Sequence, residues 1–410
     1  MEFVECTYYV ESSLPIERAA MAIAAEQSTG TWTDISTKDE QVDESLGARV
    51  LEIEDARIKI GFPIKLFEIE NIPQFLATVA GNLFGLGAIK NVRLLDIEFP
   101  KSFAREFKGP RFGIEGIRRM VGTESNRRAH VGTIIKPKVG LSPKETADVA
   151  YNAGIGGCDL IKDDETLTDQ KFCPMLERIE RVMEKIDKVK EESGRTVLYA
   201  VNITAGAEEI LERADLAIEH GANMLMIDVL TAGFSALQTL RNDESVNLPI
   251  HVHRTMHGAI TRNKRHGIAM LPLAVLVRLC GGDQLHTGTS AGKMESDVEE
   301  VKSINSFLKG DWHNFNSTFP VASGGLHPGV VPSEIEAFGS DLVLQAGGGI
   351  HGHPDGTIAG AKAMQQAVEA VMKKIPLEEY ALEHSELARA LEKWGGKVEW
   401  SDLYGKQNQL

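Results

Sequence analysis

Eight short apolar runs, each followed by a segment with helical periodicity, constrain the fold of this 410-residue chain more than any other feature. One helical segment opens with Ser142, a proline at the first helical position and Glu145 at the third, which is a strong helix start. Eight strand–helix units over roughly 250 residues are what a (β/α)8 barrel, or TIM barrel, requires. An open doubly wound sheet is the alternative, but no strand–GxGxxG–helix fingerprint supports it. The predicted strands are residues 133–137, 159–163, 197–202, 224–229, 250–253, 284–287, 319–322 and 342–346.

Residues 1–107 show a shorter alternation that predicts a separate N-terminal domain. Its strand and helix patterns follow the order βαββαβ, which is typical of a small α+β, ferredoxin-like sandwich. Gly109, Pro110, Gly113 and Gly116 mark the boundary, so residues 108–410 form the predicted barrel domain. The predicted strands are residues 3–10, 49–54, 57–62 and 91–99, and the predicted helices are residues 15–26 and 72–82.

The charge balance limits the partners of the chain. With 59 acidic and 44 basic residues the formal net charge is −15, which argues against nucleic acid and anionic membranes but leaves small anionic substrates open. Glu2 and Glu5 interrupt any signal-peptide pattern, and no apolar stretch reaches the roughly 18 residues of a membrane helix. The 4 cysteines lack CxxC spacing, which favours buried thiols in a reducing compartment. We therefore expect a cytoplasmic protein.

Polar residues gather where the predicted barrel strands end. In (β/α)8 barrels the catalytic groups stand at the C-terminal ends of strands, so these residues are candidates for an active site. One polar strand end could be accidental, whereas eight in succession are hard to explain by packing. They are Lys136 and Lys138; residues 162–165; Asn202; Asp228; His251, His253 and Arg254; His286; residues 323–325; and residues 347–349.

The run Lys162-Asp163-Asp164-Glu165 is the sharpest of these features. Alternation along a strand places Lys162 and Asp164 on one face, with Glu165 at the strand end. Two carboxylates suit a hard divalent cation, but an ammonium group has no lone pair with which to bind a metal. On these residues alone, the lysine is either the ion-pair partner of the carboxylates or a modified residue.

The run GGCDLIKDDE, which ends at Glu165, closely resembles the metal-site signature of the ribulose-bisphosphate carboxylase/oxygenase (RuBisCO) family. The resemblance implies that Lys162 reacts with activator CO2 to become a carbamate, which turns an amine into an anionic oxygen ligand. It also implies that this carbamate, Asp164 and Glu165 hold Mg2+, while Asp163 points elsewhere.

Further motifs match the family along nearly the whole chain. GTIIKPKVGLS carries Lys136 and Lys138, whose family counterparts handle protons at the enediol carbons. Neighbouring cations and a metal can lower the pKa of a lysine, which suits it for this work. QLHTGTSAGKMES carries His286, which matches a phosphate ligand, and Lys293, which matches the mobile-loop lysine that polarises incoming CO2.

The segment HVHRTMH adds a base and a phosphate clamp by the same resemblance. His253 matches the family's base for hydration, and Arg254 matches an arginine that binds phosphate. The flanking His251 and His257 are interpreted as structural histidines, because a lone histidine is more often a satisfied core residue than a functional one.

Two glycine-rich loops follow the seventh and eighth predicted strands, where barrels usually bind phosphate. Glycines let backbone N–H groups approach an anion closely. Together with Arg254 and His286 these loops indicate two separate phosphate sites, and therefore a sugar bisphosphate substrate. The loop residues are Ser323, Gly324, Gly325, Gly347 and Gly348.

The N-terminal domain carries the segments AAEQSTGTWT and AGNLFG, which contain Glu26, Thr31, Trp32 and Asn82. Their family counterparts reach into the barrel of the partner subunit and contact the substrate and the mobile loop. The resemblance therefore implies that a monomer has no complete active site. A homodimer or an assembly of dimers is expected, without a small subunit.

The segments GTIIKPKVGL, DQLHTG, HGHPDG and AGAKAM look most similar to the archaeal, large-subunit-only branch of the family. The implied reaction joins ribulose 1,5-bisphosphate, CO2 and water into two 3-phosphoglycerates, with O2 as a competing electrophile. The alternative is a RuBisCO-like enolase or isomerase that acts on a methylthio-sugar phosphate. Such proteins usually lose several of four residues that are all present here: Lys136, Arg254, His286 and Lys293. A non-catalytic scaffold is a third interpretation, but nothing in such a protein would require so many polar residues at strand ends.

Overall fold

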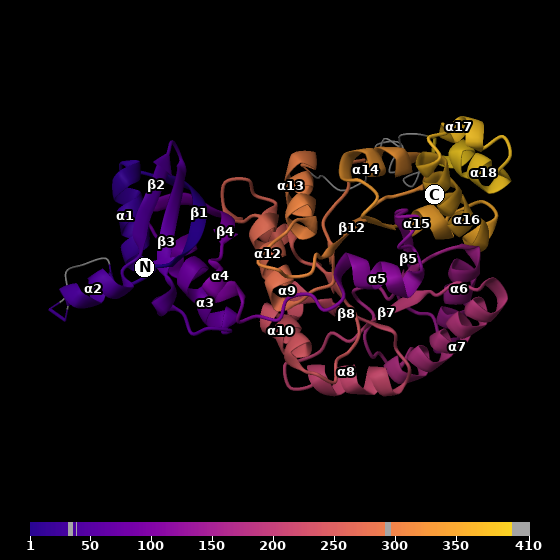
Figure 1. Ribbon diagram of the computed structural model, residues 1–410, viewed down its shortest axis with the longest axis horizontal. Coiled ribbons are helices and arrows are strands. Elements are labelled where there is room, and N and C mark those ends of the chain that lie inside the picture. The colour runs from indigo at the N-terminus through magenta and orange to yellow at the C-terminus, as the bar shows by residue number, and fades with distance from the viewer. Residues whose placement is uncertain (32–35, 38, 292–296, 396–410) are drawn as a thin grey trace, which may run out of the picture.

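The computed structural model describes residues 1–31, 36–37, 39–291 and 297–395, and its two parts lie side by side (Figure 1). The N-terminal part contains the strands β1 (Phe3–Ser12), β2 (Arg49–Glu54), β3 (Arg57–Pro63) and β4 (Ile89–Glu98) and the helices α1 (Ile16–Glu26), α2 (Glu40–Leu46) and α3 (Ile72–Ala80). Its strands pair in the antiparallel order β4-β1-β3-β2. This is the predicted ferredoxin-like arrangement, with α2 as an additional helix.

Strict alternation along β1 builds the core of this sheet. Val4, Cys6, Tyr8 and Val10 are buried, whereas the residues between them are partly exposed. This is the pattern of a strand with one covered face. Helix α1 contributes the fully buried Ile23 to the same core, so the spacing of apolar residues explains both the strand and the helix that covers it.

A short strand from the barrel half of the chain completes the N-terminal sheet. β10 (Gly267–Ile268) pairs in parallel with Arg93 and Leu94 of β4, which gives the order β10-β4-β1-β3-β2. The guanidinium of Arg93 also donates to the carbonyl of Thr261 and lies 3.3 Å from a carboxylate oxygen of Glu300. The two parts are therefore joined by main-chain and side-chain bonds. The sequence does not predict this link, because two residues show no periodicity.

The second part is a closed barrel of parallel strands, as the eight apolar runs predict. Its strands are β5 (His130–Ile134), β6 (Leu160–Lys162), β7 (Leu198–Asn202), β8 (Met224–Asp228), β9 (Ile250–His253), β11 (Gln284–His286), β12 (Phe319–Ser323) and β13 (Val343–Gln345). They follow the order β11-β12-β13-β5-β6-β7-β8-β9 around the barrel. Strand β5 lies earlier than the predicted residues 133–137, because Pro137 cannot donate to a strand ladder. Lys136 consequently belongs to the loop that follows.

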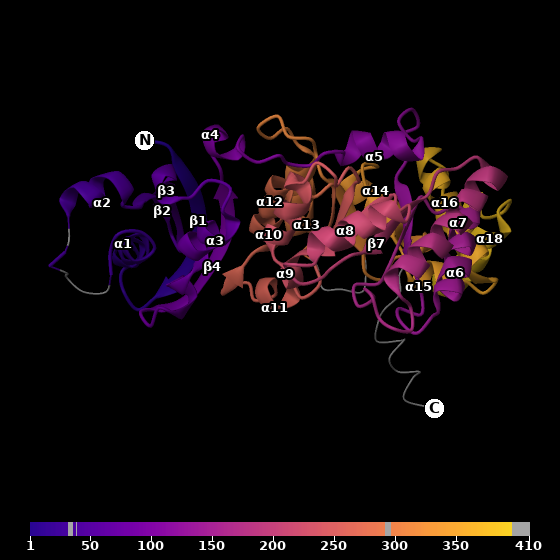
Figure 2. The same cartoon turned by 90° about the horizontal axis from the view of Figure 1, so that it is seen from below.

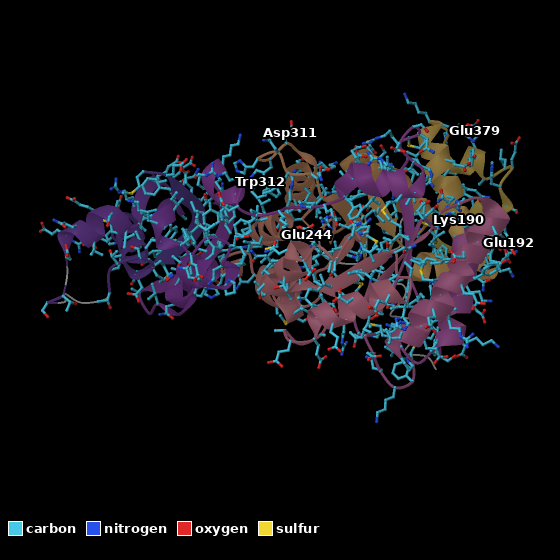
Figure 3. All side chains as sticks on the ribbon, turned by 60° about the horizontal axis from the view of Figure 1, so that its bottom comes forward. Lys190, Glu192, Glu244, Asp311, Trp312 and Glu379 are labelled. Carbon is cyan, nitrogen blue, oxygen red and sulfur yellow. The ribbon has the colours of Figure 1, made fainter. Side chains whose placement is uncertain are left out.

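Helices surround the barrel (Figures 1 and 2). Helix α6 (Pro143–Gly156) begins as predicted, with reciprocal hydrogen bonds between Ser142 and Glu145. Helix α7 (Met175–Ser193) buries one apolar face, while its Lys190 and Glu192 point outward (Figure 3). The other helices are α8 (Ile210–Glu219), α9 (Val229–Ala232), α10 (Phe234–Asn242), α11 (Gly258–Thr261), α12 (Met270–Cys280), α13 (Val298–Lys309), α14 (Val331–Phe338), α15 (Gly348–His351), α16 (Gly356–Met372), α17 (Leu377–Tyr380) and α18 (Ser385–Trp394), and the short helical turns are α4 (Lys101–Ala104), η1 (Ile64–Leu66), η2 (Asn82–Gly85) and η3 (Pro328–Val330).

Helix α5 (Gly113–Val121) closes the N-terminal end of the barrel. Its Ile114 and Ile117 share an apolar cluster with inward-facing residues near the strand starts, including Leu198, Met224 and Phe319. These side chains fill the N-terminal end of the barrel interior. The polar strand ends therefore lie at the opposite, C-terminal opening.

The 4 cysteines are buried and none forms a disulfide, as the sequence predicts. Burial raises the pKa of the thiols of Cys6, Cys158 and Cys280, so these thiols remain protonated. In the parts of the chain that the structure describes, no helix combines the length and the apolar composition needed to cross a bilayer.

Candidate active site

Seven of the eight barrel strands end on a polar side chain at the C-terminal opening, and the eighth, β5, ends on Ile134. Neighbouring parallel strands end at the same rim, so these side chains face one another across the opening. Site residues proposed from the sequence occupy four of these ends. Asn202, Asp228 and Gln345 are the additional polar ends. The seven residues are Lys162, Asn202, Asp228, His253, His286, Ser323 and Gln345.

The ammonium of Lys162 is fully enclosed at the end of β6. Its Nζ donates to the carbonyl oxygen of Asp163 at 2.7 Å and lies 3.8 Å from the sulfur of Met226. A carboxylate oxygen of Glu165 is 4.0 Å away. Burial lowers the pKa of Lys162, although the charges of Glu165 and Asp164 act in the opposite direction. A larger fraction of Lys162 than of a solvated lysine is therefore in the neutral amine form, whose lone pair could attack CO2.

Asp164 lies between Lys136 and Thr166. The Nζ of Lys136 is 2.9 Å from Asp164 Oδ2, and the hydroxyl of Thr166 donates to Oδ1 at 2.9 Å. Burial alone would raise the pKa of Asp164, but the hydrogen bond and charge of Lys136 and the bonds from Thr166 hold it below its usual value. Lys138 is exposed and has no ion-pair partner among the described residues. The structure thus brings Lys136, and not Lys138, to the carboxylates.

Asp163 faces away from this cluster into a buried network, as the sequence predicts. Its Oδ2 accepts from Nη2 and Nε of Arg178, at 3.1 and 3.2 Å. Its Oδ1 accepts from the hydroxyl of Tyr199 at 2.6 Å, and the backbone N–H of Asn202 donates to Oδ2 at 3.0 Å. Both members of the Arg178–Asp163 pair are fully buried. The network therefore holds the end of β6 in the orientation that turns Lys162 and Asp164 toward the opening.

His253 lies between two carboxylates at the rim. Its Nε2 is 3.8 Å from an oxygen of Glu165, and its Nδ1 is 3.4 Å from Oδ1 of Asp228. The side-chain amide of Asn202 donates to the other oxygen of Asp228 at 3.3 Å. Burial raises the pKa of Asp228 to about 6 and lowers that of His253 to about 3, so the ring is neutral at pH 7. The sequence marks Asn202 and Asp228 as polar strand ends but assigns neither a role.

Asp164 and Glu165 could hold a metal ion together with a modified Lys162. Within the described residues, no group of three or more His, Cys, Asp and Glu side chains is arranged to hold a metal. Two adjacent carboxylates supply the hard oxygen ligands that Mg2+ prefers. The nitrogen of Lys162 lies 4.0 Å from Glu165, so a carboxyl group on that nitrogen would add a third oxygen at the same place. The residues present fit a carbamate-supported Mg2+ site.

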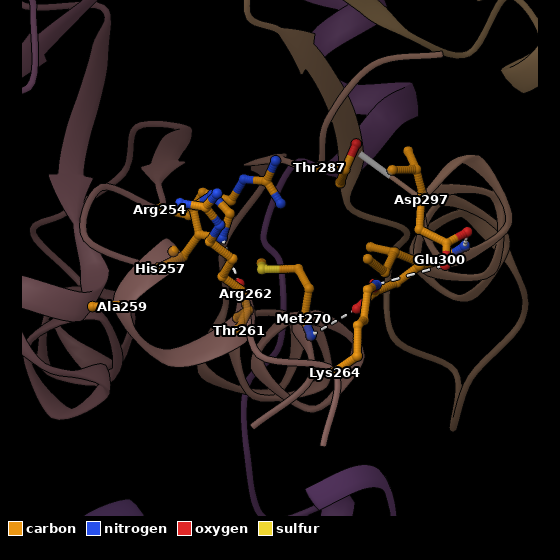
Figure 4. Close-up of a pocket in the computed structure, with 13 residues that line it drawn as sticks. Arg254, His257, Ala259, Thr261, Arg262, Lys264, Met270, Thr287, Asp297 and Glu300 are labelled. Carbon is orange, nitrogen blue, oxygen red and sulfur yellow. Dashed lines mark hydrogen bonds and ion pairs between the residues drawn. The ribbon is translucent and has the colours of Figure 1, made fainter. Parts of the chain in front are cut away.

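A cavity of about 1140 Å³ opens where β9 and β11 end (Figure 4). Arg254 and Thr287, which follow these strands, line it together with Arg262, Lys264 and Glu300. Burial lowers the pKa of Arg254 to about 10, against the effect of Glu300, and the guanidinium remains cationic at pH 7. Lys264 is already paired with Glu300 and Asp297, at 2.5 and 3.6 Å, so Arg254 is the cation that suits the cavity to an anionic group. His286, in contrast, points into the barrel and hydrogen-bonds to Ser323 at 2.7 Å.

The two glycine loops follow the neighbouring strands β12 and β13. Gly324 and Gly325 have φ angles of 115° and 89°, which glycine adopts without a steric penalty. A Cβ on Gly349 would lie 2.1 Å from the carbonyl oxygen of Leu326, so the two loops touch where only glycine fits. The structure therefore brings both predicted phosphate-binding loops to one side of the rim: Ser323, Gly324, Gly325, Gly347 and Gly348.

The residues assigned by resemblance to a partner's barrel lie on the N-terminal part. Glu26 ends α1, Thr31 is exposed and Asn82 begins η2. Figures 1 and 2 place α1 on the side of the N-terminal sheet that faces away from the barrel. A single chain therefore does not bring Glu26 to its own barrel opening. Trp32 and Lys293 lie outside the described residues.

Family models match both parts of the chain. The model of the ribulose bisphosphate carboxylase large chain, N-terminal domain, matches residues 2–103. The model of the ribulose bisphosphate carboxylase large chain, catalytic domain, matches residues 113–394. Together they span the N-terminal sheet and the barrel.

Individual relatives match over nearly the full length. The ribulose bisphosphate carboxylase of Methanocaldococcus jannaschii is 47% identical over 402 residues, which cover 92% of this chain and 94% of that protein. The octameric ribulose-1,5-bisphosphate carboxylase/oxygenase from Pyrococcus horikoshii OT3 has a TM-score of 0.92 and 44% identity, covering 97% of this chain and 95% of that chain. The dimeric archaeal Rubisco from Hyperthermus butylicus has a TM-score of 0.87 and 41% identity, covering 96% of each chain. The chain therefore belongs to the ribulose bisphosphate carboxylase large-chain family.

Proposed function

We propose that the chain is a ribulose-1,5-bisphosphate carboxylase, a carboxy-lyase that joins the sugar bisphosphate, CO2 and water into two molecules of 3-phosphoglycerate. O2 competes with CO2 for the same intermediate, which gives an oxygenase side reaction. One observation carries the proposal. Lys162, Asp164 and Lys136 meet at the barrel opening of a chain that is 47% identical to a ribulose bisphosphate carboxylase.

Carbamylated Lys162, Asp164 and Glu165 are the proposed ligands of Mg2+. When bound, Mg2+ would stabilise the negative charge that develops on the substrate as its enediolate forms. The enclosed nitrogen of Lys162 attacks the carbon of CO2 and loses a proton, which leaves the carbamate anion. Asp163 and Arg178 support this site by holding the strand end beneath it.

Lys136 and His253 are the proposed proton-transfer residues closest to this site. The ammonium of Lys136 lies beside Asp164 and can donate a proton to the substrate. His253 is neutral at pH 7, and its Nδ1 accepts from the backbone N–H of Thr255 at 3.1 Å. Its proposed role as the base that activates the hydrating water rests on the sequence resemblance. The proposed roles of Lys138 in proton transfer and of Lys293 in polarising CO2 rest on the sequence resemblance.

Two anion-binding regions at the rim support a bisphosphate substrate. Arg254, which follows β9, is the proposed ligand of one phosphate. The role of His286 in binding that phosphate rests on the sequence resemblance, because both of its ring nitrogens are hydrogen-bonded within the barrel. The glycine loops after β12 and β13 are the proposed cradle for the other, through their backbone N–H groups. Strands β5 to β8 complete the barrel between β13 and β9, and the proposed metal site lies on that arc, at the end of β6.

A homodimer or an assembly of dimers is the proposed functional unit, without a small subunit. By resemblance, Glu26, Thr31, Trp32 and Asn82 would reach the partner's barrel. For Glu26 this is supported by the position of α1, which faces away from the barrel of its own chain. Relatives with 44% and 41% identity are described as octameric and dimeric. The proposed units are an N-terminal domain of residues 1–107 and a catalytic domain of residues 108–410. A cytoplasmic location also remains a prediction.

The direct test is the incorporation of radiolabelled bicarbonate into acid-stable product. Purified enzyme with Mg2+ and ribulose 1,5-bisphosphate should fix the label, and the same mixture without the sugar should not. Exchange of the substrate C3 proton with solvent in the absence of any fixation would instead favour the enolase or isomerase alternative.

A further inference from the structure

Four side chains in the barrel interior form a continuous chain of hydrogen bonds that ends at the rim. Oε1 of Gln284 lies 2.7 Å from Nδ1 of His251, and Nε2 of His251 lies 2.8 Å from Nε2 of His286. Nδ1 of His286 lies 2.7 Å from the hydroxyl oxygen of Ser323. Gln284, His251 and His286 are 1%, 0% and 2% exposed, so only the Ser323 end reaches the opening.

Each hydrogen bond in this series needs one donor and one acceptor, so all the donors must point the same way along the series. The two Nε2 atoms of His251 and His286 face each other and can share one proton only, which leaves one of them bare. Burial lowers the pKa of His251 to about 3 and that of His286 well below its ordinary value. Both rings are therefore neutral at pH 7 with a single proton each. The position of one proton in this series of hydrogen bonds therefore determines the positions of all the others.

Gln284 sets the direction. Its Oε1 can only accept, so His251 carries its proton on Nδ1 and leaves Nε2 bare. His286 must then donate from Nε2, and its Nδ1 must accept the hydroxyl proton of Ser323. The oxygen lone pairs of Ser323, and not its proton, consequently face the opening. The opposite orientation of the Gln284 amide would reverse every proton and turn the Ser323 hydroxyl outward.

We propose that Gln284 and His251 are positioning residues: through the tautomer of His286 they hold the Ser323 oxygen as a hydrogen-bond acceptor toward the substrate. This inference rests on the proposed function, in which the loop of Ser323 lies against the sugar bisphosphate. An acceptor oxygen pairs with a hydroxyl group and not with a fully ionised phosphate, which has no proton to donate. The relay therefore gives Ser323 a preference for a sugar hydroxyl, and His251 is more than a structural histidine.

The test compares two glutamines of the barrel interior. Gln284→Met removes the acceptor at nearly constant size. Gln345→Met is the matched control, because Gln345 is also 1% exposed and its side-chain amide has no hydrogen-bond partner among the described residues. Gln284→Glu keeps an acceptor, since an ionised carboxylate cannot donate.

The first readout is the tautomer of each ring in full-length enzyme labelled with 15N-histidine. Imidazole nitrogen resonances distinguish N–H from bare nitrogen, and His251→Asn and His286→Asn assign them. The wild type, Gln345→Met and Gln284→Glu should show His251 protonated at Nδ1 and His286 at Nε2. Gln284→Met should show a mixture of tautomers on both rings. In the carboxylation assay its kcat should fall roughly tenfold with little change in KM, and Gln284→Glu should retain most of the activity.

The tautomers are read without substrate, so the relay and the proposed function fail separately. Wild-type His251 protonated at Nε2, or unchanged tautomers in a folded Gln284→Met variant, would overturn the relay even in an active carboxylase. If Gln284→Met does not fold, the wild-type and Gln284→Glu spectra decide the same question. An enzyme that fixes no CO2 but shows the expected tautomers would overturn the proposed function and support the relay.

Discussion

Lys136 Nζ lies 2.9 Å from Oδ2 of Asp164, so a proposed proton donor and a proposed metal ligand form one ion pair. The ammonium lowers the pKa of Asp164 and keeps it ionised despite its burial. The same positive charge also repels a divalent cation at the neighbouring oxygen. The pair therefore links the proton chemistry of the site to its affinity for metal.

Lys136→Gln should bind Mg2+ more tightly than the wild type while losing carboxylation. Removing one positive charge next to Asp164 should raise the affinity roughly tenfold, about 1.4 kcal/mol, in bicarbonate buffer. Equilibrium dialysis measures the affinity. Lys138→Gln makes the same change of charge two residues away on an exposed side chain and should leave the affinity unchanged. Weaker Mg2+ binding by Lys136→Gln would contradict the ion pair.

Lys162→Ala should abolish fixation, and Lys162→Arg should not restore it. A guanidinium stays protonated at neutral pH and does not readily form a carbamate. Mass spectrometry of trapped enzyme should detect the carbamate on Lys162 when CO2 and Mg2+ are both present, and on neither variant. Full activity of Lys162→Ala would refute the assignment of the metal site.

Mixing two inactive variants should restore activity if the site is shared between subunits. In a mixed dimer of Glu26→Gln and Lys162→Ala, one barrel keeps Lys162 and receives an intact Glu26 from its neighbour. Random exchange should recover about a quarter of the wild-type activity, because half of the dimers are mixed and each has one intact site. Absence of recovery, with exchange verified by differently tagged subunits, would refute a shared site.

Lys293→Ala should separate enolisation from carboxylation. Lys293 lies outside the described residues, and its role is inferred from sequence resemblance alone. Enolisation needs the metal and the nearby acid–base groups, whereas carboxylation also needs a cation over the developing carboxylate. Exchange of the C3 proton should persist while fixation falls by roughly 100-fold or more. Fixation at the wild-type rate would show that another group polarises CO2.

Glu334→Gln should lower the melting temperature. The buried carboxylate of Glu334 accepts from the backbone N–H groups of Ser290 and Ala291 and from the hydroxyl of Ser290. These three donors share one oxygen, Oε1, and the Ser290 N–H also approaches Oε2 at 3.1 Å. An amide lacks the full charge that strengthens these bonds, and its NH2 would face the Ser290 N–H, at a cost of about 1–3 kcal/mol. Glu336→Gln changes an exposed residue of the same helix and should have little effect at pH 7. Equal melting temperatures for the two variants would contradict this anchoring role.

The barrel could be predicted from the sequence because its strands are apolar runs of the right length, with polar residues where each ends. All eight predicted ranges overlap the observed strands. The boundary of β5 was the least accurate, since Ile135 continues the apolar pattern beyond the last ladder residue, Ile134. Strand β10 and helix α2 were missed, because neither has a periodic apolar face long enough to recognise.

Site residues could be predicted where they belong to a recognisable motif or stand at the end of a predicted strand, as Lys162 and Asp164 do. Gln284 and Glu334 were missed because their roles depend on partners far away in the chain. Gln284 meets His251, and Glu334 meets Ser290. A buried glutamine in a strand and a glutamate in an amphipathic helix look ordinary until the fold supplies those partners.

The pairing of Gly267–Ile268 with β4 has a mechanical consequence. A hinge between the two halves of the chain would let the N-terminal sheet change its orientation relative to the barrel. Any residue of that sheet that contacts a neighbouring molecule would then have a variable position. Two residues of shared ladder, braced by Arg93 against Glu300, remove that freedom. The orientation of the N-terminal sheet is thus fixed within each chain, so the geometry of the proposed dimer would follow from the fold of the monomer.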